Sequence, residues 1–389
     1  MNKRFTVALG ATIASSVILA ACATPAAPAA QPPAATPAAA ATTAPAATEA
    51  PAAAATEAPK ATEAPAAPAA GKIKVGLVTD VGKLSDKSFN AAAWAGVQRA
   101  VKEFGVEAKA IESNQPTDYQ KNIEQFTSEN YDLVITVGFL MGDDTAAMGK
   151  KYPQQKLAIV DVFQDDKAPK NVLGLTFAED QAGFLAGALA AQVSKTGKIG
   201  SVVGINIPPV CKYKVGYEKG AKYVKPDIKI FGVYQQPGPK AFNDPEWGKE
   251  ATLSQLKEGA DIVFAAGGQT GNGGLLGIAE QVKAGQAVLG IGVDQDQYNT
   301  LEGAKSILLT SAMKRVDQAT YLAIKDVIDG KFAGGNKVFD ITNDGVGLAP
   351  FHDNADKVPA DVQAKMDKIF AGLKDGSIKT GVVVPDDCK

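Results

Sequence analysis

The residues best suited to bind a ligand are acidic side chains that end predicted strands. Asp161 ends one run of apolar residues, 157–160, and Asp294 ends another, 288–293. Carboxylates at the carboxyl ends of parallel strands face the crevice where α/β sheets bind ligands, so both could accept hydrogen bonds from a solute. The alternative is that each aspartate caps the helix that follows it.

A second group of candidates lies in residues 86–90, just before a predicted helix of small residues. Phe89 stands among small and polar residues, an unusual place for a core aromatic, which favours a ring that contacts a ligand. It could instead act as a hydrophobic staple for the helix. Asp86 and Asn90 offer polar groups to the same ligand, although Asp86 or Ser88 also fits the role of a helix cap.

Lys314 and Gly268 complete the candidate set. Lys314 follows the predicted strand 306–313, where its ammonium group could donate to a ligand or pair with Asp294; otherwise it is a solvated lysine at a helix start. Gly268 belongs to the glycine-rich run 267–274, which either lets a ligand approach the backbone or makes a tight turn. The run contains no Walker ending and no Gly-x-Gly-x-x-Gly, so we expect no phosphate-binding loop.

Short β-branched runs and longer amphipathic segments alternate from residue 72 onward, which is the pattern of βαβ units. The predicted strands are 73–79, 108–111, 133–137, 157–160, 172–177, 199–203, 228–233, 262–266, 288–293, 306–313 and 337–342. The predicted helices are 90–104, 119–129, 181–193, 215–224, 249–258, 275–284, 316–328 and 362–373. Near-continuous apolar strands indicate parallel sheets with helices on both faces, and their number indicates two sheets. The order of the last segments favours two lobes over a closed barrel.

The beginning of the chain has the features of an export signal. Residues 1–21 contain two basic residues followed by an apolar stretch that ends in Leu-Ala-Ala before Cys22. This end resembles a bacterial lipobox, so we expect Cys22 to be lipidated; an ordinary secretory cleavage site or an uncleaved anchor is the alternative. Residues 22–70, rich in Ala, Pro and Thr, predict a disordered tether. The expected location is the outer face of the cell membrane, through a lipid anchor.

Composition excludes several classes of function. The formal net charge is −2 and no basic run is present, so we expect no nucleic-acid partner. His352 is the sole histidine, which argues against a histidine-based zinc site or a Ser-His-Asp triad, and we expect neither a metal nor a cofactor. In an oxidising compartment Cys211 and Cys388 are a candidate disulfide, with two free thiols as the alternative.

Several motifs together resemble the basic membrane lipoproteins, the purine-nucleoside-type binding proteins of ABC importers. The motifs are DKSFN at 86–90, GFLMGD at 138–143, AIVD at 158–161, FLAG at 184–187, AAGG at 265–268, GNG at 271–273, GVDQDQ at 292–297 and TSAMKR at 310–315. Each is weak alone, but their order and spacing are specific, and the resemblance covers residues 72–389.

The resemblance implies an α/β type I periplasmic binding protein, with two Rossmann-like lobes, three crossovers and a ligand cleft between the lobes. It places residues 71–179 and 306–342 in the N-terminal lobe and residues 180–305 and 343–389 in the C-terminal lobe. We expect hinges near 177–181, 296–306 and 342–350. The protein would be a monomer, not an enzyme, and its partners would be a small ligand and an ABC permease with its ATPase.

The resemblance also implies roles for the site residues. Phe89 would stack on the base of a purine nucleoside, Asp86 and Asn90 would contact the base edge, and Asp294 would bind the ribose. From their positions at strand ends, Asp161 could accept hydrogen bonds from ribose or base donors, and Lys314 could donate to ribose oxygens or pair with Asp294.

The second aromatic wall is less well defined by the resemblance. Phe264 fits the family position best, and Trp247, Phe242 and Tyr213 are the other candidates. Residues 206–217 depart from the family pattern, which carries Phe at the position of Tyr213 and lacks Cys211.

Two other classes of function remain open. One is an exported nucleoside or sugar hydrolase that uses strand-end carboxylates such as Asp161 and Asp294. The other is an adhesin or a ligand-sensing module for a membrane receptor. Turnover of a bound nucleoside would indicate the first, and the absence of an importer partner would favour the second.

Overall fold

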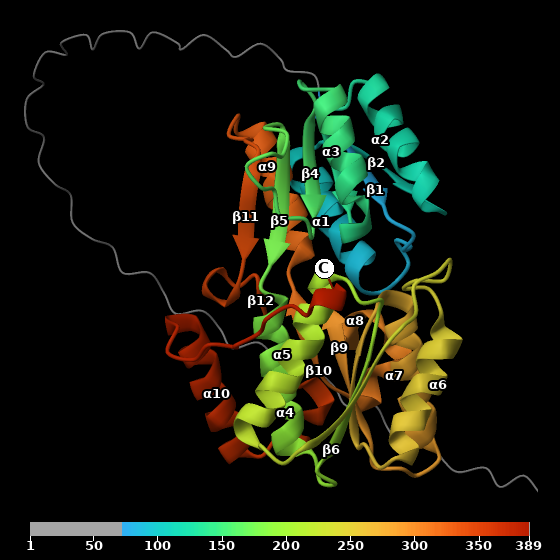
Figure 1. Ribbon diagram of the computed structural model, residues 1–389, viewed down its shortest axis with the longest axis vertical. Helices are drawn as coiled ribbons and strands as arrows, with labels where there is room; N and C mark the ends of the chain where they lie inside the picture. The colour runs from blue at the N-terminus through green and yellow to red at the C-terminus, as the bar shows by residue number, and fades with distance from the viewer. Residues whose placement is uncertain (1–71, 389) are drawn as a thin grey trace, which may run out of the picture. The chain divides into compact units, whose positions relative to one another are not determined.

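Two six-stranded sheets, each with helices packed on both faces, make up residues 72–388, the part of the chain that this computed structural model describes (Figure 1). The predicted signal sequence 1–21, the lipidation site Cys22 and the tether 22–70 lie outside the described residues. Within 72–388, every helix is too short or too polar to span a membrane.

The first sheet is parallel throughout and has the strand order β11-β5-β4-β3-β1-β2. Its strands are β1 (Lys74–Thr79), β2 (Glu107–Glu112), β3 (Leu133–Val137), β4 (Lys156–Val160), β5 (Val172–Phe177) and β11 (Gly335–Phe339). On one face the sheet packs against α1 (Phe89–Phe104) and α9 (Val316–Ile328). On the other it packs against α2 (Tyr119–Ser128) and α3 (Gly142–Lys151). We call this unit the first lobe.

The second sheet has the order β12-β10-β9-β8-β6-β7, in which only β12 runs antiparallel to its neighbour. Its strands are β6 (Lys198–Val203), β7 (Lys229–Tyr234), β8 (Ile262–Ala266), β9 (Leu289–Asp294), β10 (Leu308–Lys314) and β12 (Val346–Leu348). One face packs against α4 (Glu179–Val193), α5 (Pro208–Val224) and α10 (Ala360–Asp375). The other packs against α6 (Pro245–Lys257) and α7 (Gly268–Lys283), and the short α8 (Gln297–Thr300) follows β9. This unit is the second lobe.

The chain passes three times between the lobes, but one crossing differs from the expected place. Residues 306–314 were expected in the first lobe, whereas β10 pairs with β9 and β12 in the second sheet. The chain therefore crosses between Lys314 and Val316, and the expected hinge at 296–306 lies inside the second lobe. The strand was correctly predicted; its sheet was not, because a buried apolar run does not specify its neighbours. The other crossings follow β5 and β11, close to the expected segments 177–181 and 342–350.

Helices α4 and α5 touch backbone to backbone through glycines. A Cβ atom on Gly187 would lie 1.8 Å from the carbonyl oxygen of Tyr217, and one on Gly220 would lie 1.9 Å from that of Phe184. Such distances are far below van der Waals contact, so these positions accept no side chain without moving the helices apart. The close contact holds α5 against the second lobe, and α5 carries part of the site described below.

A covalent link also attaches α5 to the end of the chain. Cys211 and Cys388 form a disulfide, across a sequence separation of 177 residues. The sequence left open whether these cysteines form a disulfide or remain two free thiols, and the structure contains the disulfide.

The α4–α5 contact predicts an unusual outcome for Gly187→Ala. Alanine normally stabilises a helix interior by about 1 kcal/mol relative to glycine, but here we expect a loss of at least about 2 kcal/mol from overpacking. Gly238→Ala is the control, because nothing lies within 4 Å of its Cβ position. Urea unfolding of both variants provides the measurement, and equal stability of the two would contradict the close-packing argument.

Candidate functional site

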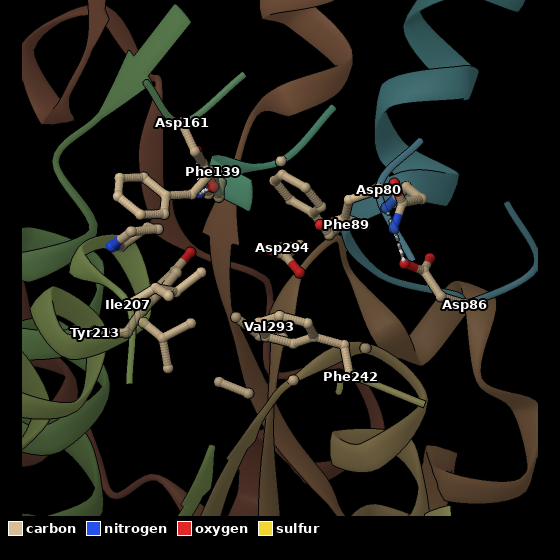
Figure 2. Close-up of a pocket in the computed structure, with 18 residues that line it drawn as sticks. Asp80, Asp86, Phe89, Phe139, Asp161, Ile207, Tyr213, Phe242, Val293 and Asp294 are labelled. Carbon is tan, nitrogen blue, oxygen red and sulfur yellow. Dashed lines mark hydrogen bonds and ion pairs between the residues drawn. The ribbon is translucent and has the colours of Figure 1, made fainter. Parts of the chain in front are cut away.

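A cavity of about 610 Å³, including its opening to solvent, lies between the two lobes at the carboxyl ends of both sheets (Figure 2). Its walls combine aromatic rings, aliphatic side chains and buried carboxylates. The lining residues are Asp80, Asp86, Phe89, Asn90, Gly138, Phe139, Asp161, Ile207, Pro209, Val210, Tyr213, Phe242, Ala266, Gly267, Gly268, Val293, Asp294 and Lys314.

This cavity brings together residues that lie far apart in the sequence. The predicted ligand-binding residues found on its walls are Asp86, Phe89, Asn90, Asp161, Gly268, Asp294 and Lys314. Asp161 directly follows β4 in the first lobe, while Asp294 and Lys314 end β9 and β10 in the second. The strand-end rule therefore accounts for three of the seven, and the other four come from the segment 86–90 and from the glycine-rich run.

Phe264, the expected second aromatic wall, lies elsewhere. It is fully buried in the middle of β8, and its ring stacks on Tyr217 with 5.3 Å between the ring centroids. Of the other candidates, Phe242 and Tyr213 line the cavity, and Trp247 does not. Figure 2 shows Phe89 and Phe242 on opposite sides of Asp294. Phe264 was misplaced because a residue inside a fully buried strand faces a helix rather than the strand end.

Asp86 organises the loop before α1. Its carboxylate accepts hydrogen bonds from the backbone amides of Ser88, Asn90 and Ala91 at 2.9–3.0 Å, and from the Asn90 side chain at 3.2 Å. The helix-cap role is therefore filled by Asp86. Asn90, whose side chain donates to Asp86, is buried. Its Oδ1 atom accepts no hydrogen bond from the described residues, so this oxygen is available to a donor in the cavity.

Lys314 is the centre of a buried ion-pair network. Its ammonium nitrogen lies 2.6 Å from Asp161 Oδ1 and 3.0 Å from Glu179 Oε1. The side chains of all three residues are at most 6 % exposed. The same nitrogen also lies 5.0 Å from the centroid of the Phe89 ring, a cation–π distance. Pairing with Asp294 was one alternative for Lys314, but its direct ion-pair partners are Asp161 and Glu179, and its burial excludes a solvated lysine.

Asp161 and Asp294 share an unusual backbone conformation. Their φ angles are 73° and 65°, in the left-handed region that non-glycine residues rarely adopt. This backbone conformation turns the chain sharply at the end of each of the two strands, and both carboxylates lie on the cavity wall. Asp294 Oδ2 accepts a hydrogen bond of 2.5 Å from the Ser88 hydroxyl, which joins the second lobe to the first.

Asp80 is a site residue that the sequence reasoning missed. It follows β1 directly, so the rule that identified Asp161 and Asp294 also applied to it. Its Oδ1 atom accepts a hydrogen bond from the amide of Gly82 at 2.8 Å. Gly138, at φ 119°, leaves room for it, because a Cβ there would lie 2.3 Å from Asp80 Oδ2. Phe139, Ile207 and Val210 were also missed, because apolar side chains in loops and first turns carry no distinctive pattern.

Burial changes the charge state of the carboxylates. Removal from water raises the pKa of Asp80 to about 7 and that of Asp294 to about 7, with smaller contributions from neighbouring carboxylates. Burial also raises the pKa of Asp161 to about 6, although Lys314 opposes the change. For Lys314, burial lowers the pKa, but Asp161, Glu179 and Asp294 together raise it above its usual value. The lysine is therefore a permanent cation.

The lobes are joined around the loop 85–88, which we call the clasped loop. Five side chains of the second lobe donate hydrogen bonds of 2.6–3.2 Å to its carbonyl oxygens. These are Gln269 to Ser85, Asn272 to Asp86, Gln297 and Thr300 to Lys87, and Gln295 to Ser88. The described lobes are thus in a closed arrangement.

The raised carboxylate pKa values predict how stability depends on pH. Asp80 and Asp294 bind protons more tightly in the folded than in the unfolded chain, so their contribution to stability is fully present below about pH 4 and is lost as pH rises from about 4 to about 7. In thermal melts of the ligand-free protein, Asp294→Asn should lose less stability over this range than the wild type. Parallel curves for the two proteins would contradict the assignment.

Comparisons with known proteins place the chain in a family. The family model described as ABC transporter substrate-binding protein PnrA-like matches residues 73–379. The chain is 33% identical to the ABC transporter nucleoside-binding protein BmpA of Lactococcus lactis, covering 79% of this chain and 88% of the relative. It is also 33% identical to an uncharacterized lipoprotein of Pyrococcus abyssi, covering 72% and 69%.

A solved structure supports the same assignment. A solute-binding protein of an ABC transporter system from Aeropyrum pernix is 26% identical, with a TM-score of 0.74, and the match covers 81% of this chain and 94% of that chain. This likeness confirms the type I periplasmic binding protein fold. The chain belongs to the PnrA-like family of ABC transporter substrate-binding proteins.

Proposed function

We propose that this protein is an exported lipoprotein that captures a purine nucleoside and delivers it to an ABC importer. The observation that carries the proposal is the pair of rings Phe89 and Phe242, which come from different lobes and flank Asp294 (Figure 2). Two rings that close from opposite lobes suit a flat base, and stacking of a base on an aromatic ring contributes about 1–3 kcal/mol.

The polar groups of the cavity match the rest of a nucleoside. Asn90 Oδ1, buried without a partner, would accept a hydrogen bond from the base edge, and Asp86 would hold Asn90 in place. Asp294 would accept from ribose hydroxyls. Lys314, fixed by Asp161, would donate to a ribose oxygen, and Gly268 would let the sugar approach the backbone.

The charge balance of the cavity favours a neutral ligand. Asp80, Asp86, Asp161 and Asp294 line it together with one cation, Lys314, which is already paired. A phosphate group would meet carboxylates rather than a cluster of arginines or lysines, whereas hydroxyl and N–H donors would find acceptors. The proposed ligand is accordingly an unphosphorylated nucleoside.

Delivery requires the protein to stay near its permease. Cys22 provides the proposed lipid attachment, and residues 23–70 provide the tether. The clasped loop supports a ligand-bound closed form that a permease distinguishes from an open one, because ligand shifts the population only by its differential affinity for the two forms.

Binding by the purified fragment 71–389 provides the main test. Inosine, guanosine or adenosine should raise the melting temperature, whereas ribose and the nucleotides should not. Phe89→Ala should weaken nucleoside binding about tenfold or more through the lost stacking, and Asp294→Ala should also weaken it. Isothermal titration calorimetry gives the affinities.

Phe163→Ala is the matched control, because that ring is 67 % exposed and does not line the cavity. If nucleosides do not bind while another solute does, the transport role survives but the base-stacking assignment fails. Chromatography of the incubated nucleoside checks for release of free base, which would instead support the hydrolase alternative.

The lipid anchor has a separate test. In a bacterial expression host fed radiolabelled palmitate, the full-length protein should be labelled and should sediment with membranes. Cys22→Ser should abolish the label and leave the protein in the soluble fraction. Labelling that persists in Cys22→Ser would place the lipid elsewhere.

A further inference from the structure

The last described residues of the chain are attached to α5, a helix that carries cavity residues. Helix α10 stops at Gly376, whose φ of 77° turns the chain out of the helix. Residues 376–388, which we call the C-terminal strap, then pass from α10 to the upper end of α5 in the view of Figure 1. The strap contains almost no regular structure beyond the short turn Asp386–Cys388.

Among the contacts that hold the strap, three reach segments that carry site residues. The Thr380 hydroxyl donates to Asp180 Oδ2 at 2.5 Å, and the Asn206 side chain donates to the carbonyl oxygen of Asp387 at 2.7 Å. The third contact is the disulfide between Cys388 and Cys211, both of which are at most 1 % exposed. The two hydrogen bonds are individually weak, so the disulfide is the main restraint.

Each contact adjoins a residue of the site. Asp180 follows Glu179, a partner of Lys314, and Asn206 precedes Ile207 on the cavity wall. Cys211 lies between Val210 and Lys212, which both contact parts of the site. Val210 lines the cavity, and the Lys212 ammonium lies 3.3 Å from Glu179 Oε2, so the strap also reaches the buried ion-pair network.

The first turn of α5 begins with Pro208 and Pro209, which have no amide hydrogen and therefore leave no donor there for a side chain to cap. The amide of Cys211 donates to Ile207 at 2.9 Å. Cys211 is therefore the residue that makes this hydrogen bond at the start of α5. The disulfide is attached in the same turn as the residues that form one wall of the cavity.

We propose that Cys211 and Cys388 are positioning residues for ligand binding: the strap and its disulfide hold the first turn of α5 in the geometry that closes around the ligand. The ligand part of this inference rests on the proposed function. Without the bridge, the α5 wall moves more freely, and the ligand leaves faster.

Cys388→Ser removes the bridge without changing a cavity residue. We expect faster amide hydrogen exchange for residues 210–217 in the ligand-free protein, with unchanged exchange in β1 and β3 of the first lobe. We also expect nucleoside dissociation to be about tenfold faster, with a smaller change in association. Exchange is read by mass spectrometry and dissociation by stopped-flow fluorescence.

Val383→Ser is the matched control, because this strap residue is 78 % exposed and makes no contact that the inference uses. Phosphine reduction of folded wild-type protein, with loss of the buried bridge verified by thiol alkylation and mass spectrometry, should reproduce the Cys388→Ser result, and the same treatment should leave Cys388→Ser unaffected. This arm also decides the question if Cys388→Ser fails to fold.

Unchanged exchange and dissociation after reduction would overturn the proposal, since the bridge would then only stabilise the fold. If nucleosides fail to bind the wild type, the proposed function fails, but the exchange measurement still tests whether the strap holds the α5 wall. The two failures are therefore distinguishable.

Discussion

The buried ammonium group of Lys314 is the interaction on which the site depends. It joins Asp161 at the end of β4 to Glu179 at the start of α4, so one cation connects the first lobe to the segment that follows the first crossing. Lys314 itself stands at the second crossing. Removing one partner of a buried ion pair leaves an uncompensated charge and typically costs about 3–5 kcal/mol. The network therefore sets the geometry of the crossings and of the cavity together.

Sequence reasoning located the strands and their acidic ends well because both follow from local rules. The apolar runs at 133–137, 172–177 and 262–266 match β3, β5 and β8 residue for residue. Asp161 and Asp294 were identified because the ends of parallel strands meet at one edge of a sheet. The same rule applies to Asp80, which directly follows β1 but was not among the predicted site residues.

What escaped the sequence depends on contacts between distant segments. The pairing of β10 with β9, and the inward position of Phe242 rather than Phe264, are decided by which surfaces meet in three dimensions. Helix α3 was missed because Gly142 and two aspartates begin it, a composition typical of loops. The partner of Cys211 was a candidate only because the chain offers so few cysteines.

The clasped loop has a consequence for how long any solute stays in the cavity. To open, the lobes must break the hydrogen bonds that Gln269, Asn272, Gln295 and their neighbours make to carbonyl oxygens of residues 85–88. None of these bonds involves the solute. Part of the free-energy barrier to solute release is therefore the same for every solute. Changes in the clasped loop would alter residence time, whereas changes in the cavity wall would alter selectivity.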